Sequence, residues 1–473
     1  MLFNTLDFGI FFSIVFALYW TLGKKSVKAQ NYILLLASYF FYGYWDWWFL
    51  ILLFISSATD FLVAILLDQT SSARRRKLLL SISLIVNLGL LFSFKYFNFF
   101  IGSFIEKFSF AGFVFTRNDV SFILPIGISF YTLQTLSYTI DVYRKHIPAT
   151  RNWVEFFTYV SFFPQLAAGP IERAGKMLPQ FKVLRSFDYT AAKDGMRQIL
   201  LGLFKKIVIA DACGRQVDLI FSDYQNLNGS TLFIGAIYFL FQVYGDFSGY
   251  SDMAIGMGRL FGLKLSQNFH YPFLAKNPRE LWQRWHISLT TWFRDYVYIP
   301  LGGNRQSEFR TQVNLLIVFL LSGLWHGAYW TFIVWGAIHG VVFLFHRNLS
   351  TLKPLKIMGF FQKSTRLTGF ISALTVFIYF SLSAVFFRSA TVSEALDYFR
   401  HLWSPSLFTI PQHYSKVFIL LPFILFEWYQ RDQTHALQIG NWKTWQRWVT
   451  YYLFMALISY YFTTERSYIY FQF

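Results

Sequence analysis

The sequence is poor in cysteine and in charged residues. Cys213 is the only cysteine, so the chain can form no internal disulfide and no cysteine-based metal site. Charged residues make up 14% of the chain, well below the roughly 25% of ordinary soluble domains. A soluble protein of 473 residues needs a largely polar and charged surface. This composition therefore excludes an ordinary soluble protein.

Several catalytic motifs are also absent from the sequence. It contains no Gly-x-Ser-x-Gly nucleophile elbow, no P-loop and no His-Glu-x-x-His zinc motif. Cys213 is a weak candidate for a nucleophile, because a lone buried cysteine is usually inert. The first apolar run contains Asp7 and lacks the basic start and the small-residue cleavage site of a signal peptide. We therefore expect that run to be a permanent membrane span.

Apolar and aromatic residues dominate what is present. The chain is 55% hydrophobic, with 59 Phe, 29 Tyr and 16 Trp, a composition that suits a bilayer as solvent. Its net charge is +18, but the basic residues form short clusters between apolar runs rather than one patch. We therefore expect no nucleic-acid partner. Such Lys and Arg residues are typical of cytoplasmic loops that meet anionic membrane lipid.

The apolar runs predict an all-α polytopic membrane protein. A bilayer core requires about 20 mostly apolar residues per helix. Suitable runs lie near residues 7–22, 30–44, 46–66, 78–97, 121–140, 195–213, 231–250, 312–328, 331–346, 368–387, 416–429 and 447–463. The stretch 153–168 is shorter and ends in Pro and Gly, so we predict a re-entrant segment there. With no internal repeat and no linker, we expect one membrane domain over residues 1–473, with roughly 10–12 transmembrane helices.

The basic clusters predict the orientation of the chain. Residues 24–28, 74–77 and 144–151 carry Lys and Arg and alternate with weakly charged turns. The positive-inside rule places these loops in the cytoplasm and the N-terminus outside. The same parity places the basic segments 259–311 and 347–366 inside, and loop 214–230 outside.

The stretch 281–296 predicts one amphipathic helix. At about 100° per residue, one face carries Trp282, Trp285, Leu289, Trp292 and Tyr296. This pattern is typical of a helix that lies at a membrane interface or in a membrane funnel. His286 lies at the edge of the aromatic face, available to either environment. Such a Trp-rich face is most often interfacial packing rather than a cofactor site.

Two further histidines lie in the almost uncharged stretch 311–346, as Trp325-His326-Gly and Ile338-His339-Gly. Ionisable groups inside spans are costly and are functional hypotheses by default. The two are 13 residues apart, which is about 220° of rotation on one helix. We therefore expect them on two arms of a hairpin, with flanking glycines that allow close backbone approach. For each histidine, hydrogen bonding between helices is the alternative interpretation.

Several of these motifs together resemble the membrane-bound O-acyltransferase superfamily, and in particular its bacterial branch that contains the alginate O-acetyltransferase membrane subunit. The central ones are Arg284-Trp-His286-Ile-Ser-Leu, Trp292-Phe-Arg-Asp-Tyr296, Leu301-Gly-Gly-Asn-Arg305 and Leu324-Trp-His326-Gly. Others are Leu124-Pro-Ile-Gly-Ile-Ser-Phe-Tyr131, Tyr138-Thr-Ile-Asp-Val-Tyr-Arg144, Ala168-Gly-Pro170 and the run from Asp246 to Gly256. The resemblance covers about residues 1–350 in order.

The resemblance implies helices around a central funnel or tunnel, in the plasma (inner) membrane of a bacterium. It implies transfer of an acyl group, expected to be acetyl, from a cytoplasmic thioester to a surface polysaccharide, directly or through an extracytoplasmic acyltransferase partner. The family's near-invariant histidine corresponds to His326, and its second histidine to His286. We assign His326 as general base, and His286 or a Trp indole N–H as a donor to the oxyanion.

We assign binding of the acyl donor, either acetyl-CoA or an acyl carrier protein thioester, to six residues around these motifs. They are Arg284, Arg294, Trp285, Trp325, Asn304 and Arg305. Arginines on the cytoplasmic side suit the phosphates of such a donor, although they also fit the positive-inside rule. We expect no permanently bound cofactor and no metal.

Other functions remain open from the residues. A transporter or flippase for an envelope glycan or lipid intermediate would also place polar motifs in spans, although it predicts symmetric broken helices. An acyltransferase with a protein or lipid acceptor, and a non-catalytic envelope scaffold, are further alternatives. For Asp246, Ser248 and Asp252, which lie in or at the end of an apolar run, we favour hydrogen bonding between helices.

Overall fold

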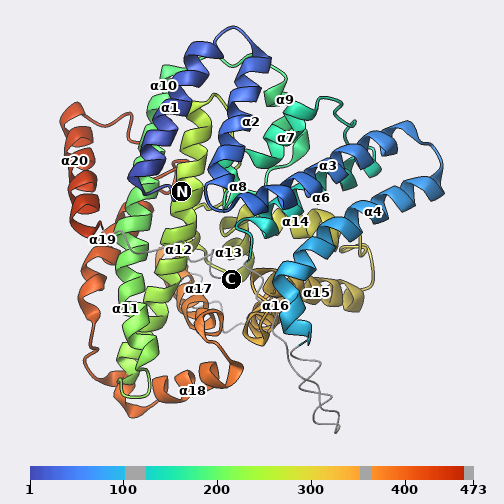
Figure 1. Ribbon diagram of the computed structural model, residues 1–473. Helices are drawn as coiled ribbons and strands as arrows, with labels where there is room; N and C mark the ends of the chain where they lie inside the picture. Colours follow the sequence, from blue (N-terminus) through green and yellow to red (C-terminus); the bar gives the residue numbers. More distant parts are fainter. Residues whose placement is uncertain (102–123, 352–364, 463–473) are drawn as a thin grey trace. The chain divides into compact units, whose positions relative to one another are not determined.

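The computed structural model describes residues 1–101, 124–351 and 365–462. Within these ranges every regular element is a helix (Figure 1). The prediction of an all-α protein is therefore confirmed. The chain forms two compact units that interleave in sequence: Met1–Gly195 with Ala254–Ser266, and Met196–Met253 with Gln267–Phe473. We call them unit 1 and unit 2. The single domain over 1–473 stays a prediction.

Unit 1 contains the N-terminal helices. They are α1 (Leu6–Leu22), α2 (Val27–Gly43), α3 (Trp47–Gln69), α4 (Ala73–Leu91) with the π-helical turn η1 (Phe92–Tyr96), α6 (Ile128–Tyr143), α7 (Trp153–Ser161), α8 (Phe163–Leu166) and α9 (Ala174–Phe181). α10 (Tyr189–Phe204) and α12 (Gly229–Leu260) contribute residues to both units.

Unit 2 contains the remaining helices. They are η2 (Lys205–Ala210), α11 (Asp211–Ser222), η3 (Pro272–Leu274), α13 (Pro278–Arg284), α14 (Ile287–Phe293), η4 (Arg294–Tyr298), α15 (Glu308–His326), α16 (Trp330–Thr351), α17 (Thr365–Arg388), α18 (Val392–Leu402), η7 (Pro405–Phe408), η8 (Tyr414–Lys416), α19 (Val417–Tyr429) and α20 (Thr444–Tyr461).

Each predicted apolar run coincides largely with helical residues. The run 121–140 is helical only from Ile128, because residues 124–127 form a loop and turn before the helix, and residues 121–123 and 463 lie outside the described residues. By length and composition, five described helices can cross a membrane: Trp47–Gln69, Ala73–Ile101, Gly229–Leu260, Trp330–Leu349 and Leu367–Arg388. The other runs form helices that are shorter or more polar; α19, for example, has only 13 residues. The total of roughly 10–12 spans therefore stays a prediction.

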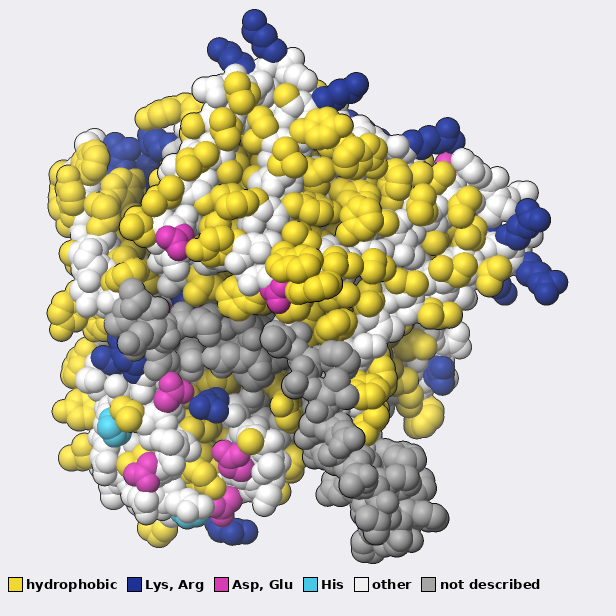
Figure 2. Space-filling model, in the orientation of Figure 1, with side chains coloured by type: hydrophobic (Ala, Val, Ile, Leu, Met, Phe, Trp, Pro, Cys, Tyr) yellow, Lys and Arg dark blue, Asp and Glu magenta, His cyan; other side chains and the backbone are white. Residues whose placement is uncertain are grey.

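The outer faces of these helices are apolar. On α1 the exposed large hydrophobic side chains recur every four residues: Leu6, Ile10, Ile14, Leu18 and Leu22. That spacing marks one continuous helix face, which suits contact with lipid. Figure 2 shows hydrophobic side chains over the helices of unit 1, with Lys and Arg at the turn between α1 and α2 and at the turn between α3 and α4. These are two of the basic clusters that the positive-inside rule predicts to be cytoplasmic.

Unit 1 buries a polar seam between three of its helices. The Asp60 carboxylate of α3 accepts hydrogen bonds from Ser83 and Asn87 of α4, the latter at 2.9 Å. Ser56 donates to the side-chain Oδ1 of Asn87 at 2.6 Å, and Thr135 of α6 donates to the same oxygen at 3.3 Å. Hydrogen bonds of this kind satisfy polar groups that an apolar bundle would otherwise leave unsolvated.

The stretch 153–168 does not form one long helix. α7 and α8 meet at Phe162, and their side chains from Val154 to Ser161 and from Phe163 to Leu166 are buried in unit 1. Neither helix is long enough to cross a bilayer core. This agrees with the prediction of a non-spanning segment whose irregular backbone is enclosed by protein.

In unit 2, α15 and α16 form a tightly packed antiparallel hairpin (Figure 1). A Cβ atom on Gly323 would collide with the Phe332 carbonyl, and one on Gly336 would collide with the Phe319 carbonyl. Only glycine permits this approach, as expected for small residues between membrane helices. The hairpin predicted to separate His326 from His339 is thereby confirmed.

Candidate active site

The segment 281–296 is not one helix, which corrects the prediction. α13 ends at Arg284, and α14 begins at Ile287. Between them His286 adopts a left-handed conformation with φ +44°, which a continuous right-handed helix cannot include. The peptide N–H of Ile287 bonds to the Asn268 carbonyl at 2.9 Å rather than to a carbonyl of α13. A contact with a distant segment therefore interrupts the helical pattern.

The predicted aromatic face is buried in protein rather than presented to a membrane interface. Trp282, Trp285, Leu289 and Trp292 are all buried, while Tyr296 is half-buried. Trp285 packs edge-on against Phe380 of α17, with ring centroids 4.8 Å apart, and Trp282 packs against Trp335 of α16 at 5.9 Å. The periodicity correctly predicted that these residues lie in apolar surroundings. It was wrong about the surroundings, which are other helices of the protein rather than a membrane interface.

The two histidines assigned to catalysis lie together in unit 2. His286 and His326 have ring centroids 6.2 Å apart, and their exposed fractions are 1% and 4%. His326 is the last residue of α15, so it lies in the last turn of a helix rather than in the middle of one. The structure thus brings together two residues that the sequence placed in separate motifs.

Aromatic rings enclose this histidine pair. Trp325 packs against both imidazoles, at 5.7 Å from His286 and 5.0 Å from His326. Phe247 of α12 meets His286 edge-on at 4.5 Å. Trp335 meets His326 at 5.4 Å. These rings shield much of both imidazoles from solvent.

Burial lowers the pKa of His286 well below its ordinary value of 6.5, and the neighbouring His326 lowers it further. An apolar environment disfavours the charged imidazolium. His286 is therefore neutral near pH 7. A neutral imidazole can accept a proton at one ring nitrogen and donate a hydrogen bond from the other.

His339 has a structural role. Its Nδ1 contacts the Tyr379 hydroxyl, and its Nε2 lies 3.1 Å from the Ser383 hydroxyl, both on α17. Ser383 donates its own hydrogen to the Phe380 carbonyl at 2.8 Å. It therefore accepts from Nε2–H, and Tyr379 donates to Nδ1. These bonds join α16 to α17, which favours the alternative of hydrogen bonding between helices.

The six residues assigned to donor binding fall in three settings. Trp285 and Trp325 are buried beside the histidine pair. Arg284 is engaged within the protein, paired with Glu280 at 2.7 Å and bonded to the His270 carbonyl at 3.2 Å. Arg294, Asn304 and Arg305 are exposed. These last three are the most exposed of the six residues, so a donor headgroup could reach them without rearrangement of the protein.

The turn that carries Asn304 and Arg305 is shaped by glycine. Gly302 and Gly303 have φ values of +105° and +57°, conformations that glycine adopts readily. Arg294 is 59% exposed and pairs with its neighbour Asp295 at 2.8 Å. An exposed ion pair of this kind is weak, so it leaves the guanidinium available to a phosphate.

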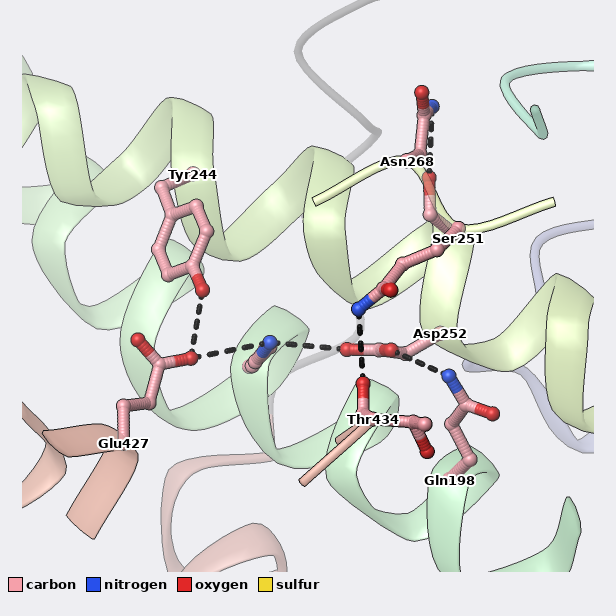
Figure 3. Close-up of polar contacts among 9 residues, drawn as sticks. Gln198, Tyr244, Ser251, Asp252, Asn268, Glu427 and Thr434 are labelled. Atoms are coloured by element: carbon pink, nitrogen blue, oxygen red, sulfur yellow. Dashed lines mark hydrogen bonds and ion pairs between the residues drawn. The ribbon is translucent and has the colours of Figure 1, made fainter. Parts of the chain in front are cut away.

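Sequence reasoning missed a buried ion cluster formed by Lys205, Asp252 and Glu427. Lys205 lies 3.0 Å from Asp252 and 3.3 Å from Glu427. Figure 3 shows Tyr244 donating to Glu427 and Gln198 donating to Asp252, at 2.6 and 2.8 Å. The available signal was a pair of lysines inside the predicted span 195–213, where charge is unexpected.

The adjacent lysine makes a second set of ion pairs. Lys206 lies 2.7 Å from Asp246 and 2.9 Å from Asp211, and its side chain is 1% exposed. Both lysines belong to the π-helical turn η2, a feature frequent at functional sites. Asp246 and Asp252 thus join α12 to η2 through hydrogen bonds, as favoured from the sequence, and these hydrogen bonds are also ion pairs.

A family model and several curated relatives match this chain. The model for the membrane-bound O-acyltransferase family matches residues 35–389. The probable alginate O-acetylase of Azotobacter vinelandii is 43% identical over 59% of this chain and 56% of its own length. The peptidoglycan O-acetyltransferase of Helicobacter pylori is 37% identical over 67% and 63%. The teichoic acid D-alanyltransferase of Streptococcus thermophilus is 30% identical over 46% and 55%.

The chain spans little more than half the length of these relatives. The family model, in contrast, covers most of the chain, including both histidines and every residue assigned to donor binding. Several helices are also long and apolar enough to cross a membrane. The protein is therefore a multi-pass membrane protein that belongs to the membrane-bound O-acyltransferase family.

Proposed function

We propose that this protein is a membrane O-acyltransferase that transfers an acyl group, expected to be acetyl, from a cytoplasmic thioester toward hydroxyls of an extracytoplasmic polysaccharide. The observation that carries the proposal is the buried pair of His286 and His326 in an aromatic enclosure. The relatives named for alginate, peptidoglycan and teichoic acid support a polysaccharide as the final acceptor.

In this proposal His326 acts as general base. A hydroxyl is a poor nucleophile at neutral pH, so the imidazole removes its proton as the oxygen attacks the thioester carbonyl, a contribution of about 10²–10⁴-fold. The C–O bond forms and the C–S bond breaks. The departing sulfur then takes the proton from the imidazolium, so an ester and a free thiol leave and the histidine is regenerated.

In the same scheme His286 stabilises the oxyanion of the tetrahedral intermediate by donating a hydrogen bond. The tetrahedral intermediate needs donors that are already in place. A neutral His286 can donate from one ring nitrogen, and its ring lies next to that of His326. The indole N–H groups of Trp285 and Trp325 are further donors of the same region.

The acyl donor is acetyl-CoA or an acyl carrier protein thioester. Arg294, Asn304 and Arg305 would meet its phosphates, because these exposed groups lie in the basic segment that charge parity places in the cytoplasm. The proposal includes a bacterial inner-membrane location and an extracytoplasmic N-terminus. It also includes an extracytoplasmic acyltransferase as partner when transfer to the glycan is indirect.

The test compares a strain that lacks the gene with strains complemented by wild type or by His326→Ala at equal membrane abundance. Ester-linked acetyl on extracted surface glycans is quantified by NMR. We expect wild type to restore the ester and the variant not to. Full restoration by the variant would overturn the role of His326. Identical ester in all strains would overturn the polysaccharide acceptor and favour a protein, a lipid or transport.

A further inference from the structure

The residue at the N-cap of α14 does not cap the helix with its own side chain. His286 occupies the cap position with φ +44° and ψ +52°, and its side chain makes no capping hydrogen bond. The first peptide N–H groups of a helix lack acceptors within the helix. In a buried site these groups need acceptors from elsewhere in the protein, because unsatisfied polar groups are costly there.

Asn268 supplies those acceptors from a distant part of the chain. Its backbone carbonyl accepts the Ile287 N–H at 2.9 Å. Its side-chain Oδ1 accepts the Ser288 N–H at 3.2 Å and the Ser288 hydroxyl at 2.9 Å. Asn268 is completely buried. From a separate segment of the same chain, Asn268 thus performs the role that a cap residue normally performs for its own helix.

Asn268 is itself held on its other side. Its Nδ2 donates to the Ser251 hydroxyl of α12 at 3.3 Å (Figure 3). Two residues further on, the His270 N–H donates to the Arg284 carbonyl at 2.9 Å. Segment 268–270 is therefore bonded to the chain both before and after His286. Ser251 is followed by Asp252 of the ion cluster, which anchors this part of α12.

We propose that Asn268 is a positioning residue of the candidate active site, which fixes His286 in the left-handed turn that turns its ring toward His326. The effect of Asn268 on catalysis rests on the proposed function. Its role as the cap of α14 rests on the hydrogen bonds alone. Because Asn268 caps α14, the His286 side chain is not required for capping and can face the reaction. A left-handed histidine persists only where its surroundings enforce it.

Two substitutions and a matched control test this role. Asn268→Ala removes the Oδ1 acceptor and keeps the backbone carbonyl. Asn268→Asp keeps an acceptor oxygen at the same place, as a cap residue requires. Asn31→Ala is the control, because Asn31 is also buried and bonds to the Phe181 carbonyl and to Arg185, at 2.8 and 2.7 Å, in unit 1. Purified full-length proteins are compared in detergent micelles.

The first measurement is amide hydrogen exchange of peptides that cover residues 285–293. We expect exchange there to become faster in Asn268→Ala and to stay slow in Asn268→Asp and Asn31→Ala. Unchanged exchange in Asn268→Ala would overturn the capping role. Because it requires no substrate, this result stands whether or not the proposed function is correct.

The second measurement is the thiol released from acetyl-CoA, with a short polyuronate oligosaccharide as acceptor. We expect kcat of Asn268→Ala to fall about 10- to 100-fold, the effect of a displaced catalytic group, while KM for acetyl-CoA changes less than about twofold. Asn268→Asp should recover most of kcat. Faster exchange with unchanged kcat would overturn the positioning role. Absence of thiol release in the wild type would count against acetyl-CoA and a polyuronate as the substrates of the proposed function, and the capping role would still be decided by the exchange measurement.

Discussion

His286 and His326 lie with their ring centroids 6.2 Å apart, although one precedes a short helix and the other ends a long one. Both are buried among aromatic rings. We expect His326→Ala to reduce acetyl transfer by about 10²–10⁴-fold, because the general base is lost. Transfer from acetyl-CoA by purified protein measures this. His401→Ala, at a partly exposed histidine of α18 that contacts Asp397 and Tyr224, should leave the rate unchanged, and equal losses in both variants would contradict a catalytic role.

The pH dependence of stability should report the burial of His286. Its pKa is lowered in the folded protein from an ordinary value of 6.5, so below that pH the unfolded chain binds more protons than the folded one. Titration of His286 therefore does not reduce the free energy of unfolding above pH 6.5 and reduces it as the pH decreases below that value. The reduction is at most about 1.4 kcal/mol per pH unit for one proton. Unfolding midpoints of wild type and His286→Asn, measured from pH 7.5 to 5.5 (roughly the range in which histidine titrates), should diverge, with the smaller slope in the variant. Equal slopes would show that His286 does not contribute.

Removal of the Lys205 charge should destabilise unit 2. Lys205→Met leaves Asp252 and Glu427 without their shared cation, and breaking a buried ion pair in this way costs about 3–5 kcal/mol. Denaturant unfolding in detergent measures the loss. The control is Lys193→Met, since Lys193 is exposed on the preceding helix α10. The double variant Lys205→Met/Glu427→Gln should regain part of the stability, and no recovery would argue against charge as the cause.

A substitution that forces α15 away from α16 should impair the candidate active site without changing a residue that lines it. Gly323→Ala would collide with the Phe332 carbonyl, and His326 follows in the same last turn of α15. We expect destabilisation of about 1–3 kcal/mol from overpacking, together with reduced transfer. Gly89→Ala in α4 meets open space and should instead stabilise the helix by up to about 1 kcal/mol. Thermal unfolding distinguishes the two, and similar shifts in both would contradict the close approach.

The exposed arginines should affect donor binding rather than chemistry. Arg294→Ala and Arg305→Ala each remove a cation from solvent-exposed positions, and a lost charge-assisted contact to a phosphate is worth about 1.5–3 kcal/mol. KM for acetyl-CoA should therefore rise about tenfold or more, with kcat nearly unchanged. Arg400→Ala on α18, also exposed, is the control. A fall in kcat without a change in KM would assign these residues to another role.

The sequence by itself determined the helical class, the positions of the apolar runs and the α15–α16 hairpin. These features are local: residues within one run set its apolarity, and a rotation per residue sets which side chains share a face. The same locality grouped Trp282, Trp285, Leu289 and Trp292 as apolar positions, and all four are buried in the protein. It also identified His326 as a candidate, because histidine in an apolar run is unusual, whereas His286 was assigned through the resemblance to the acyltransferase family.

Only the tertiary structure decided where those helices break and which charges meet. The turn at His286 exists because Asn268, from another segment, accepts the N–H groups that a continuous helix would have satisfied. Lys205 is tolerated because Glu427, far along the chain, lies 3.3 Å away. His339 bonds to Tyr379 and Ser383 of the next helix. Such contacts join residues that are far apart in the sequence, so no periodic pattern predicts them. They stabilise the protein only once the helices have packed together.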